Sequence, residues 1–321
     1  MIVTVTPNPA IDVTLTVDTL TAGEINRTTS KHRDPAGKGI NVARALAKNG
    51  HATIAVFPAD PVNGSWIVRA LAEAGVESST TPIIGEVRNN ITIVDGTGLT
   101  TKINEPGPVV TPAEISALSE KLEWRLDEHP TWLVAAGSLP VGLDADFLVD
   151  LGHRAAAKGV RFAVDTSGPT LARVSASGVP DLIKPNAVEL EELAGRPLRT
   201  VGDVVDAARA LLPGGEIVVS LGANGALLVT DDFVLWAGHP PVVADSTVGA
   251  GDSALAGYLS VRTQGNFPTR HHAALATAVA WGTAAVTLPG TTVPGPADID
   301  VTRVSVVDDP DRSTLIQELR A

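Results

Sequence analysis

The sequence contains no cysteine, which excludes a disulfide framework and thiolate chemistry. Aromatic residues make up only 3% of its 321 residues, whereas hydrophobic residues make up 44%. The core must therefore be built from Ala, Val, Leu and Ile, as is typical of parallel α/β folds. A chain of this length is sufficient for one large α/β domain or two modest ones.

Positive charge is also scarce, because 24 Lys and Arg residues face 36 Asp and Glu residues, which gives a formal net charge of −12. This balance argues against non-specific binding to nucleic acid or to anionic membranes. It does not argue against a phosphorylated substrate, since a few Lys and Arg residues can invert the field inside one cleft.

Long hydrophobic runs are missing as well. The longest apolar stretch, residues 273–286, is too short to span a bilayer. The first seven residues have a strand pattern and lack the basic region that opens a signal peptide. We therefore expect a soluble cytoplasmic protein with no membrane or nucleic-acid partner.

Apolar, β-branched runs alternate with amphipathic helical patterns, which predicts βαβ units and a mostly parallel sheet covered by helices on both faces. The predicted strands are residues 2–6, 53–57, 132–136, 160–164, 182–183 and 217–220. The predicted helices are residues 40–49, 66–74, 112–128, 145–157, 188–194 and 201–211, with a short one after 308–313. Ligands of such sheets bind beyond the carboxyl ends of the strands, so the site is expected in the loops that follow them.

Two stretches interrupt this alternation. Residues 12–33 and 87–104 are rich in β-branched residues and each contains a turn with glycine, which predicts two β-hairpins. The hairpins can form a small sheet that covers the site as a lid, or they can be ordinary surface hairpins. The predicted division is an α/β core of residues 1–11, 34–86 and 105–321, with an inserted β-lid of residues 12–33 and 87–104.

The most informative segment is Ser-Thr-Val-Gly-Ala-Gly-Asp-Ser at 246–253, which leads into an apolar run. Backbone amides of Gly249, Ala250 and Gly251, at the start of a helix, suit a negatively charged group. Asp252 beside such an anion cradle can act as a general base toward an attacking hydroxyl, which is the equipment for phosphoryl transfer to an alcohol. The alternative is that Asp252 simply caps a helix.

A second glycine-rich entry to a helix is Gly37-Lys38-Gly39, followed by Asn41. Backbone donors, the helix dipole and a lysine converge there, which suits a phosphate or sugar hydroxyls. The spacing matches neither the P-loop nor the dinucleotide-binding fingerprint. A surface turn with a solvated lysine is the alternative.

Asn186 and Glu189 lie three residues apart at a predicted helix start that follows Lys184. Their oxygens suit a hydrated Mg²⁺ that accompanies nucleotide phosphates. The same spacing is nearly that of a capping box, and both interpretations can hold together.

Several weaker candidates lie in other loops. The loop at 220–226, with Ser220, Gly222 and Gly225, suits a nucleotide contact but also a plain β-turn, and Ser138 follows another predicted strand. Asp12, just beyond the first strand, is placed to hydrogen-bond sugar hydroxyls, or is an ordinary turn carboxylate.

Three cations, Arg27, Arg88 and Lys102, lie in the predicted hairpins. In so acidic a chain they can converge on a sugar phosphate, with solvated positions as the alternative.

Seven motifs occur in an order that resembles the ribokinase-like (PfkB) carbohydrate kinases, from residue 4 to about residue 290. They are Thr-Pro-Asn-Pro-Ala-Ile-Asp at 6–12, Ala-Gly-Lys-Gly-Ile-Asn at 36–41, Asn-Glu-Pro-Gly-Pro at 104–108, Gly-Ser-Leu-Pro at 137–140, Lys-Pro-Asn at 184–186, Ser-Leu-Gly at 220–222 and the segment ending at Asp252. The chain is most similar to the phosphosugar branch, and there to the 1-phosphofructokinases. It departs from many relatives at Ala36, where they have glycine, and beside Arg88, where the neighbouring residues differ.

The resemblance implies a three-layer αβα core with a β-lid that forms a homodimer, and MgATP as the phosphoryl donor. It implies phosphorylation of fructose 1-phosphate at the C6 hydroxyl to give fructose 1,6-bisphosphate. Tagatose-6-phosphate kinase and 6-phosphofructokinase are alternatives, and a non-catalytic sugar-phosphate sensor is an alternative of another class.

It also implies roles for individual residues. Asp252 is the base, and residues 249–251 are the anion hole. The residues assigned to the phosphosugar are Asp12, Arg27, Gly37, Lys38, Gly39, Asn41, Arg88, Lys102, Asn104 and Ser138. Those assigned to the nucleotide are Lys184, Asn186, Ser220, Gly222, Gly225 and Thr247, with Asn186 and Glu189 on Mg²⁺ and residues 273–286 beside the adenine.

Overall fold

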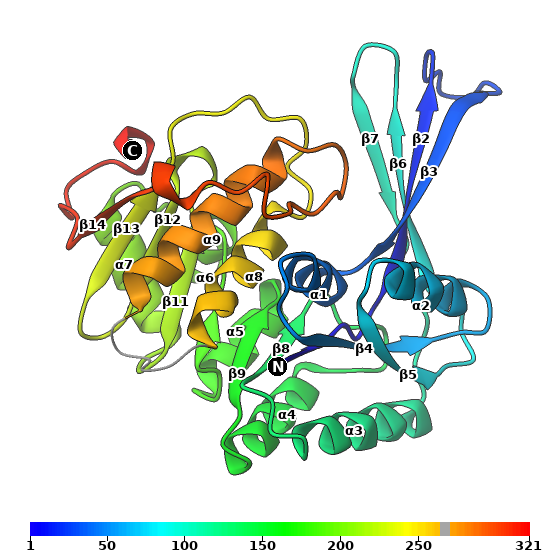
Figure 1. Cartoon of the computed structure of the whole chain (residues 1–321), viewed down its shortest axis with the longest axis horizontal. Coiled ribbons are helices and arrows are strands. Elements are labelled where there is room, and N and C mark those ends of the chain that lie inside the picture. The colour runs from blue at the N-terminus through cyan, green and yellow to red at the C-terminus, as the bar shows by residue number, and fades with distance from the viewer. Residues whose placement is uncertain (264–269) are drawn as a thin grey trace.

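The computed structural model describes residues 1–263 and 270–321. A ten-stranded sheet with the order β14-β13-β12-β11-β10-β9-β8-β1-β4-β5 forms the centre of the molecule (Figure 1), and it is parallel from β11 to β5 and antiparallel from β11 to β14. The strands are β1 (Ile2–Val5), β4 (Thr53–Ala59), β5 (Glu77–Pro82), β8 (Trp132–Ala136), β9 (Arg161–Asp165), β10 (Leu182–Ile183), β11 (Glu216–Ser220), β12 (Ala226–Val229), β13 (Val234–Gly238) and β14 (Ser305–Asp308).

Helices cover both faces of this sheet, which confirms the predicted three-layer α/β fold. On one face lie α1 (Lys38–Lys48), α2 (Asn63–Glu73), α8 (Ala250–Arg262) and α9 (His271–Val286). On the other lie α3 (Pro112–Leu126), α4 (Ala145–Ala157), α5 (Gly168–Ala176), α6 (Ala187–Ala194) and α7 (Val201–Leu211).

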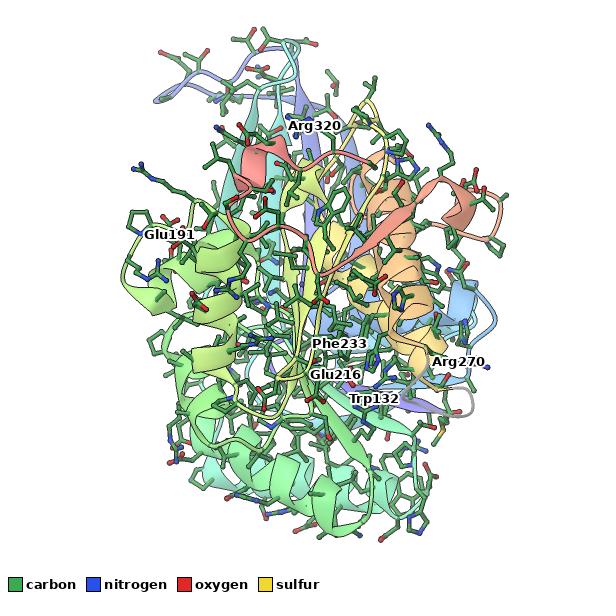
Figure 2. The ribbon with its side chains drawn as sticks, turned by 90° about the vertical axis from the view of Figure 1, so that its left-hand side faces the viewer. Trp132, Glu191, Glu216, Phe233, Arg270 and Arg320 are labelled. Carbon is green, nitrogen blue, oxygen red and sulfur yellow. The ribbon has the colours of Figure 1, made fainter. Side chains whose placement is uncertain are left out.

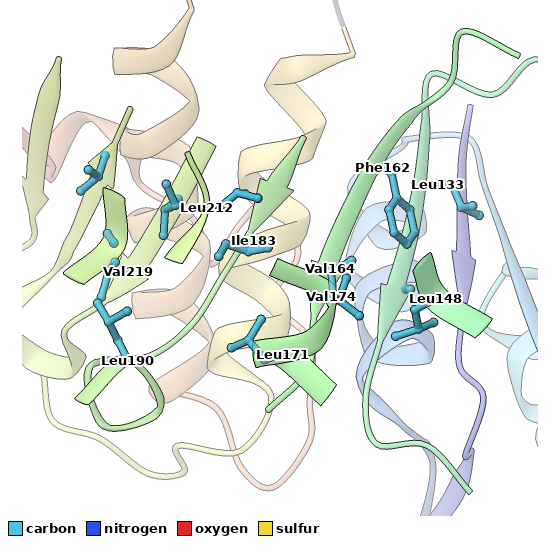
Figure 3. Packing of buried hydrophobic residues seen from close by; sticks show 14 of the residues in the cluster. Leu133, Leu148, Phe162, Val164, Leu171, Val174, Ile183, Leu190, Leu212 and Val219 are labelled. Atoms are coloured by element: carbon cyan, nitrogen blue, oxygen red, sulfur yellow. The ribbon is translucent and has the colours of Figure 1, made fainter. Parts of the chain in front are cut away.

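Side-chain alternation along the strands produces the two faces. In β8, Trp132 and Val134 pack toward α8 and α9, whereas Leu133 packs in the opposite cluster. That opposite cluster, where Leu148 and Leu171 meet the strands, is shown in Figure 3. Because both faces of the parallel strands are buried, these strands are apolar throughout and their positions are readable in the sequence.

The two predicted hairpins form a separate four-stranded sheet, with the order β3-β2-β6-β7, that projects from the core (Figure 1). Its strands are β2 (Ala10–Val17), β3 (Thr28–Ala36), β6 (Arg88–Val94) and β7 (Thr100–Asn104). Ile11 at its base is buried against Ile40 and Phe57 of the core. The first hairpin is longer than predicted, because its strands begin at Ala10 and end at Ala36.

Some elements lie outside the predicted set: β5, β12, β13, β14 and α5 have no counterpart among the predicted strand and helix ranges. The predicted short helix near the end of the chain is a single 3-10 turn (Ile316–Glu318), and β14 precedes it. β14 is an edge strand with mostly exposed residues, so it lacks the continuous apolar pattern of a buried strand.

A charged cluster lies at the amino ends of the strands around Glu216, the first residue of β11, which is labelled in Figure 2. Its carboxylate accepts hydrogen bonds from Arg262 and, at 2.6 Å, from the Tyr258 hydroxyl, both on α8, and from Arg161 at 3.0 Å. Burial would raise the pKa of Glu216, but its hydrogen bonds and the two arginines lower it to about 2. The cluster therefore anchors α8 at the end away from Asp252.

Among the described helices, none combines the length and the apolar composition that a membrane crossing requires.

Candidate active site

The carboxyl ends of the parallel strands and the amino ends of two helices meet at one place. Asp165 is the last residue of β9, and Lys184 follows β10 directly. Lys38 begins α1, and Asp252 lies in the first turn of α8. Ion pairs connect Asp165 to both lysines, and the charge of Asp165 also acts on Asp252. The structure thus brings together segments that are far apart in the sequence.

Asp252 is buried in a position suited to a general base. The residue is 7% exposed, and its Oδ2 accepts a hydrogen bond of 2.8 Å from Asn41 Nδ2 on α1. Burial, and then the nearby negative charge of Asp165, raise the pKa of Asp252 from 3.8 to about 6, although Asn41 and two lysines oppose the change. A carboxylate with a pKa just below neutrality is ionised at pH 7 and still basic enough to accept a proton.

Asp165 is the acidic centre of the site, and it is not among the residues predicted from the sequence. Its carboxylate is 2.7 Å from Lys38 Nζ and 2.9 Å from Lys184 Nζ, with 1% of the residue exposed. Burial would raise the pKa of Asp165, but the two lysines outweigh it and lower the pKa. One signal in the sequence could have identified Asp165: it directly follows a predicted strand. The neighbouring strand β8 ends just before Gly137-Ser138, which were predicted to belong to the site.

Glycines shape both helix entries. Gly37 has a φ of 118°, and a Cβ on Gly39 would lie 2.5 Å from the Thr6 Oγ1, so the turn into α1 requires both glycines. Gly249 caps α8 with a φ of 76°, in the left-handed region. A Cβ on Gly251 would lie 3.2 Å from Lys184 Nζ, so this lysine lies beside Gly251 in the first turn of α8.

Asn186 and Glu189 form a capping box at the start of α6. Asn186 Oδ1 accepts from the Glu189 amide at 2.8 Å, and Glu189 Oε2 accepts from the Asn186 amide at 2.9 Å. The other carboxylate oxygen, Oε1, lies 4.0 Å from Lys38 Nζ and so faces the site. No group of three or more acidic or His side chains that could enclose a metal occurs among residues 1–263 and 270–321.

The base of the lid contributes a second group of polar residues. Asp12 is half-buried, and its Oδ1 accepts from Asn90 Nδ2 at 3.0 Å. Burial raises the pKa of Asp12, against the effect of the Asn90 hydrogen bond. Arg88 donates to the carbonyl of Glu105 at 2.9 Å and to Ser138 Oγ at 3.4 Å. Arg88 and Ser138 therefore meet where the lid joins the core.

Ser138 belongs to the same site as the lysines, because a Cβ on Gly137 would lie 3.8 Å from the Lys38 amide nitrogen. Ser220 is bridged to Asn186 by strand-like pairing, so the hairpin turn that holds Gly222 and Gly225 begins beside α6.

The structure does not bring the remaining candidates into this cluster. Arg27 directly precedes β3 at the end of the lid farthest from the core, and it is exposed. Asn104, at the end of β7, is exposed but pairs with Asn90 at the base of the lid. Lys102 is exposed on the edge strand β7, and Thr247 is exposed in the segment before α8. A second subunit or a ligand would be needed for contacts between these residues and the cluster.

This arrangement defines a class of protein: an α/β phosphotransferase in which a buried carboxylate lies beside a glycine-rich helix start, with a β-lid above. The chain belongs to the pfkB family of carbohydrate kinases, which it matches over residues 6–298. The fold agrees with solved phosphofructokinases, so the predicted ribokinase-like core with a small separate sheet is confirmed.

Three relatives show the similarity at the level of individual proteins. The chain is 37% identical over 284 residues to 1-phosphofructokinase of Rhodobacter capsulatus, covering 88% of this chain and 89% of that protein. It is 37% identical over 258 residues to ATP-dependent 6-phosphofructokinase isozyme 2 of Escherichia coli, covering 78% and 82%. The crystal structure of Escherichia coli phosphofructokinase-2 in complex with potassium aligns with a TM-score of 0.85 and 33% identity, covering 92% and 96%.

Proposed function

We propose that this sugar kinase transfers the γ-phosphoryl group of ATP to the C6 hydroxyl of fructose 1-phosphate, which gives fructose 1,6-bisphosphate. The observation that carries the proposal is the buried carboxylate of Asp252 beside the amides of residues 249–251. The similarity to curated 1-phosphofructokinases supports the choice of fructose 1-phosphate.

In the proposed mechanism, Asp252 accepts the proton of the C6 hydroxyl as its oxygen attacks phosphorus. Asn41 donates a hydrogen bond to Oδ2 of this carboxylate and so fixes its orientation. The amides of residues 249–251 and the ammonium of Lys184 stabilise the charge on the transferring phosphoryl group. Lys38 and Arg88 bind the sugar phosphate, and Asp12 binds sugar hydroxyls.

Two lysines gain further partners when substrates bind. Lys38 and Lys184 neutralise Asp165, and each is held in place by that ion pair. When phosphates of both substrates are bound, the lysines serve them as well, because an ammonium group can donate three hydrogen bonds. Asp165 therefore keeps both cations directed at the site.

The residues present fit MgATP. The amide-lined start of α8 with Lys184 nearby suits the phosphates, and Glu189 Oε1 faces the site as one carboxylate oxygen toward hydrated Mg²⁺. Asn186 contributes mainly by holding Glu189 through the capping box. When bound, Mg²⁺ neutralises charge on the phosphates.

We also propose that the lid pairs two subunits into a homodimer in the cytoplasm. Its outer part exposes large apolar side chains, Ile25 at 82%, Leu99 at 67% and Ile103 at 53%, and both edge strands carry unpaired backbone groups. In a dimer, Arg27 and Lys102 of one lid can approach the partner's substrate.

The test is a coupled assay of ADP release with fructose 1-phosphate, fructose 6-phosphate, tagatose 6-phosphate and fructose. We expect the highest kcat/KM with fructose 1-phosphate. A higher value with fructose 6-phosphate would instead support the activity named for the Escherichia coli relative. Binding of a sugar phosphate without release of ADP would identify a sensor and refute the kinase.

A further inference from the structure

Asn8 is a buried polar residue that joins three segments around the lid base. It lies between β1 and β2, and only 3% of it is exposed. Its Nδ2 donates to the Pro106 carbonyl at 3.0 Å and to Ser138 Oγ at 3.2 Å. Its backbone carbonyl accepts from Arg88 Nη2 at 3.4 Å. One residue therefore contacts both Ser138 and Arg88, which lie together at the base of the lid.

The neighbours of Asn8 fix the orientation of its amide. The Pro106 carbonyl can only accept a hydrogen bond, so the Asn8 nitrogen, and not its oxygen, must face it. A Cβ on Gly107 would lie only 2.2 Å from Asn8 Oδ1, so the oxygen side is packed against a residue without a side chain. The amide is thus a donor toward Ser138 as well.

This orientation dictates what the Ser138 hydroxyl can do. Its oxygen accepts from Asn8 Nδ2 and, at 3.4 Å, from Arg88 Nη2, which uses both of its lone pairs. Its own hydrogen remains available to donate, and the residue is exposed. A hydroxyl group that normally serves as donor or acceptor is here committed to donation.

We propose that Asn8 is a positioning residue that commits the Ser138 hydroxyl to donation and aligns it with the Arg88 guanidinium. The Ser138 O–H and the Arg88 N–H groups that Glu105, Asn8 and Ser138 do not occupy then form a set of donors, which suits the phosphate of the acceptor sugar, a group that mainly accepts hydrogen bonds. The inference rests on the proposed function for the identity of that phosphate. It adds a residue that acts through Ser138 without touching the substrate.

A double-mutant cycle tests this inference. We expect Asn8→Ala and Ser138→Ala each to weaken binding of fructose 1-phosphate about tenfold, with binding of fructose changed less than about twofold. Both changes remove the same directed hydrogen bond. The double variant should therefore bind fructose 1-phosphate no more weakly than the weaker-binding single variant. The proposal would be overturned if the fold-losses of affinity in the two single variants multiplied in the double variant. It would also be overturned if affinity for fructose and for fructose 1-phosphate fell equally.

Asn8→Asp gives an independent arm in a side chain of the same size. The carboxylate cannot donate to Ser138 and accepts its hydrogen instead, so we expect weaker fructose 1-phosphate binding than in Asn8→Ala. Binding as tight as in the wild type would contradict the proposal. Asn49→Ala is the matched control, since Asn49 Nδ2 likewise donates two hydrogen bonds, here to the backbone carbonyls of Ala45 and Pro294 at 2.9 and 3.0 Å, at the end of α1 away from the site. It should leave sugar binding unchanged.

Calorimetry without ATP, using fructose 1-phosphate, fructose 6-phosphate and fructose, separates this inference from the proposed function. Suppose that the losses of binding free energy are non-additive and confined to the phosphorylated sugars, and that the coupled assay detects no ADP release with any sugar. The inference would then stand and the kinase would be refuted. Normal turnover together with additive losses of binding free energy would support the kinase and refute the inference. A wild-type protein that binds neither sugar phosphate would overturn both.

Discussion

Replacing Asp252 by Asn is expected to abolish most turnover and yet make the folded protein more stable at neutral pH. The buried carboxylate of Asp252 has its pKa raised from 3.8 to about 6, first by burial and then by Asp165. A raised pKa means that the ionised form is less favourable in the folded protein than in the unfolded chain. A pKa difference of one corresponds to about 1.4 kcal/mol, so the ionised carboxylate costs the folded state about 3 kcal/mol.

The pH dependence of this cost follows from the two pKa values. The cost is absent well below pH 3.8, where the group is protonated in both states, and it is complete above pH 6. The neutral carboxamide of the Asp252→Asn variant avoids this cost and can still accept the hydrogen bond from Asn41. Relative to the wild type, Asp252→Asn should therefore gain about 3 kcal/mol in the free energy of unfolding at about pH 8 and only about 1 kcal/mol at about pH 4.5.

The measurement is urea-induced unfolding at both pH values, together with ADP release. Asp165→Asn is the contrasting variant, since it leaves Lys38 and Lys184 without their buried partner and should lose about 3–5 kcal/mol. Asp150→Asn, an exposed change on α4, is the control and should stay within about 0.5 kcal/mol. A loss of stability in Asp252→Asn at the higher pH, or a gain that does not shrink in acid, would refute the reasoning.

Two further predictions concern the ligands. Lys38→Ala should raise KM for the sugar phosphate by at least about tenfold more than KM for ATP, and Lys184→Ala should do the opposite. Steady-state kinetics measures both KM values, and the reverse order would exchange the substrates assigned to the two lysines. Asn186→Ala and Thr200→Ala each remove a capping box and should each lower stability by about 1 kcal/mol. Only Asn186→Ala should raise the Mg²⁺ concentration needed for half-maximal activity, and equal Mg²⁺ requirements would mean that Asn186 and Glu189 act as a cap alone.

The parts of the fold that are best predicted from the sequence are those with a single strong pattern. Buried parallel strands such as β8 are apolar on both faces, and helices such as α3 carry a capping box with Pro112 in the first turn. The lid was predictable because its hairpins break the alternation. Edge strands such as β14 were not, since exposure removes the apolar pattern on which the prediction depends.

The candidate site was predictable where one short segment carries several features. Asp252 directly follows Gly249-Ala250-Gly251 in the chain, and the structure places its carboxylate in the interior. Asp165 was missed because its significance lies in two lysines 127 and 19 residues away, and long-range ion pairs leave no local pattern. The proposed role of Asn8 in orienting Ser138 was not predictable for the same reason, since the two residues are 130 positions apart.

The most direct test of Asp252 as the base is the pH dependence of kcat/KM for fructose 1-phosphate, which reports groups of the free enzyme. We predict that kcat/KM falls roughly tenfold per pH unit below about pH 6, the pKa of Asp252. Since the substrate's phosphate titrates near the same pH, the residual activity of Asp252→Asn provides the background. A profile that is identical in the two proteins would contradict the account.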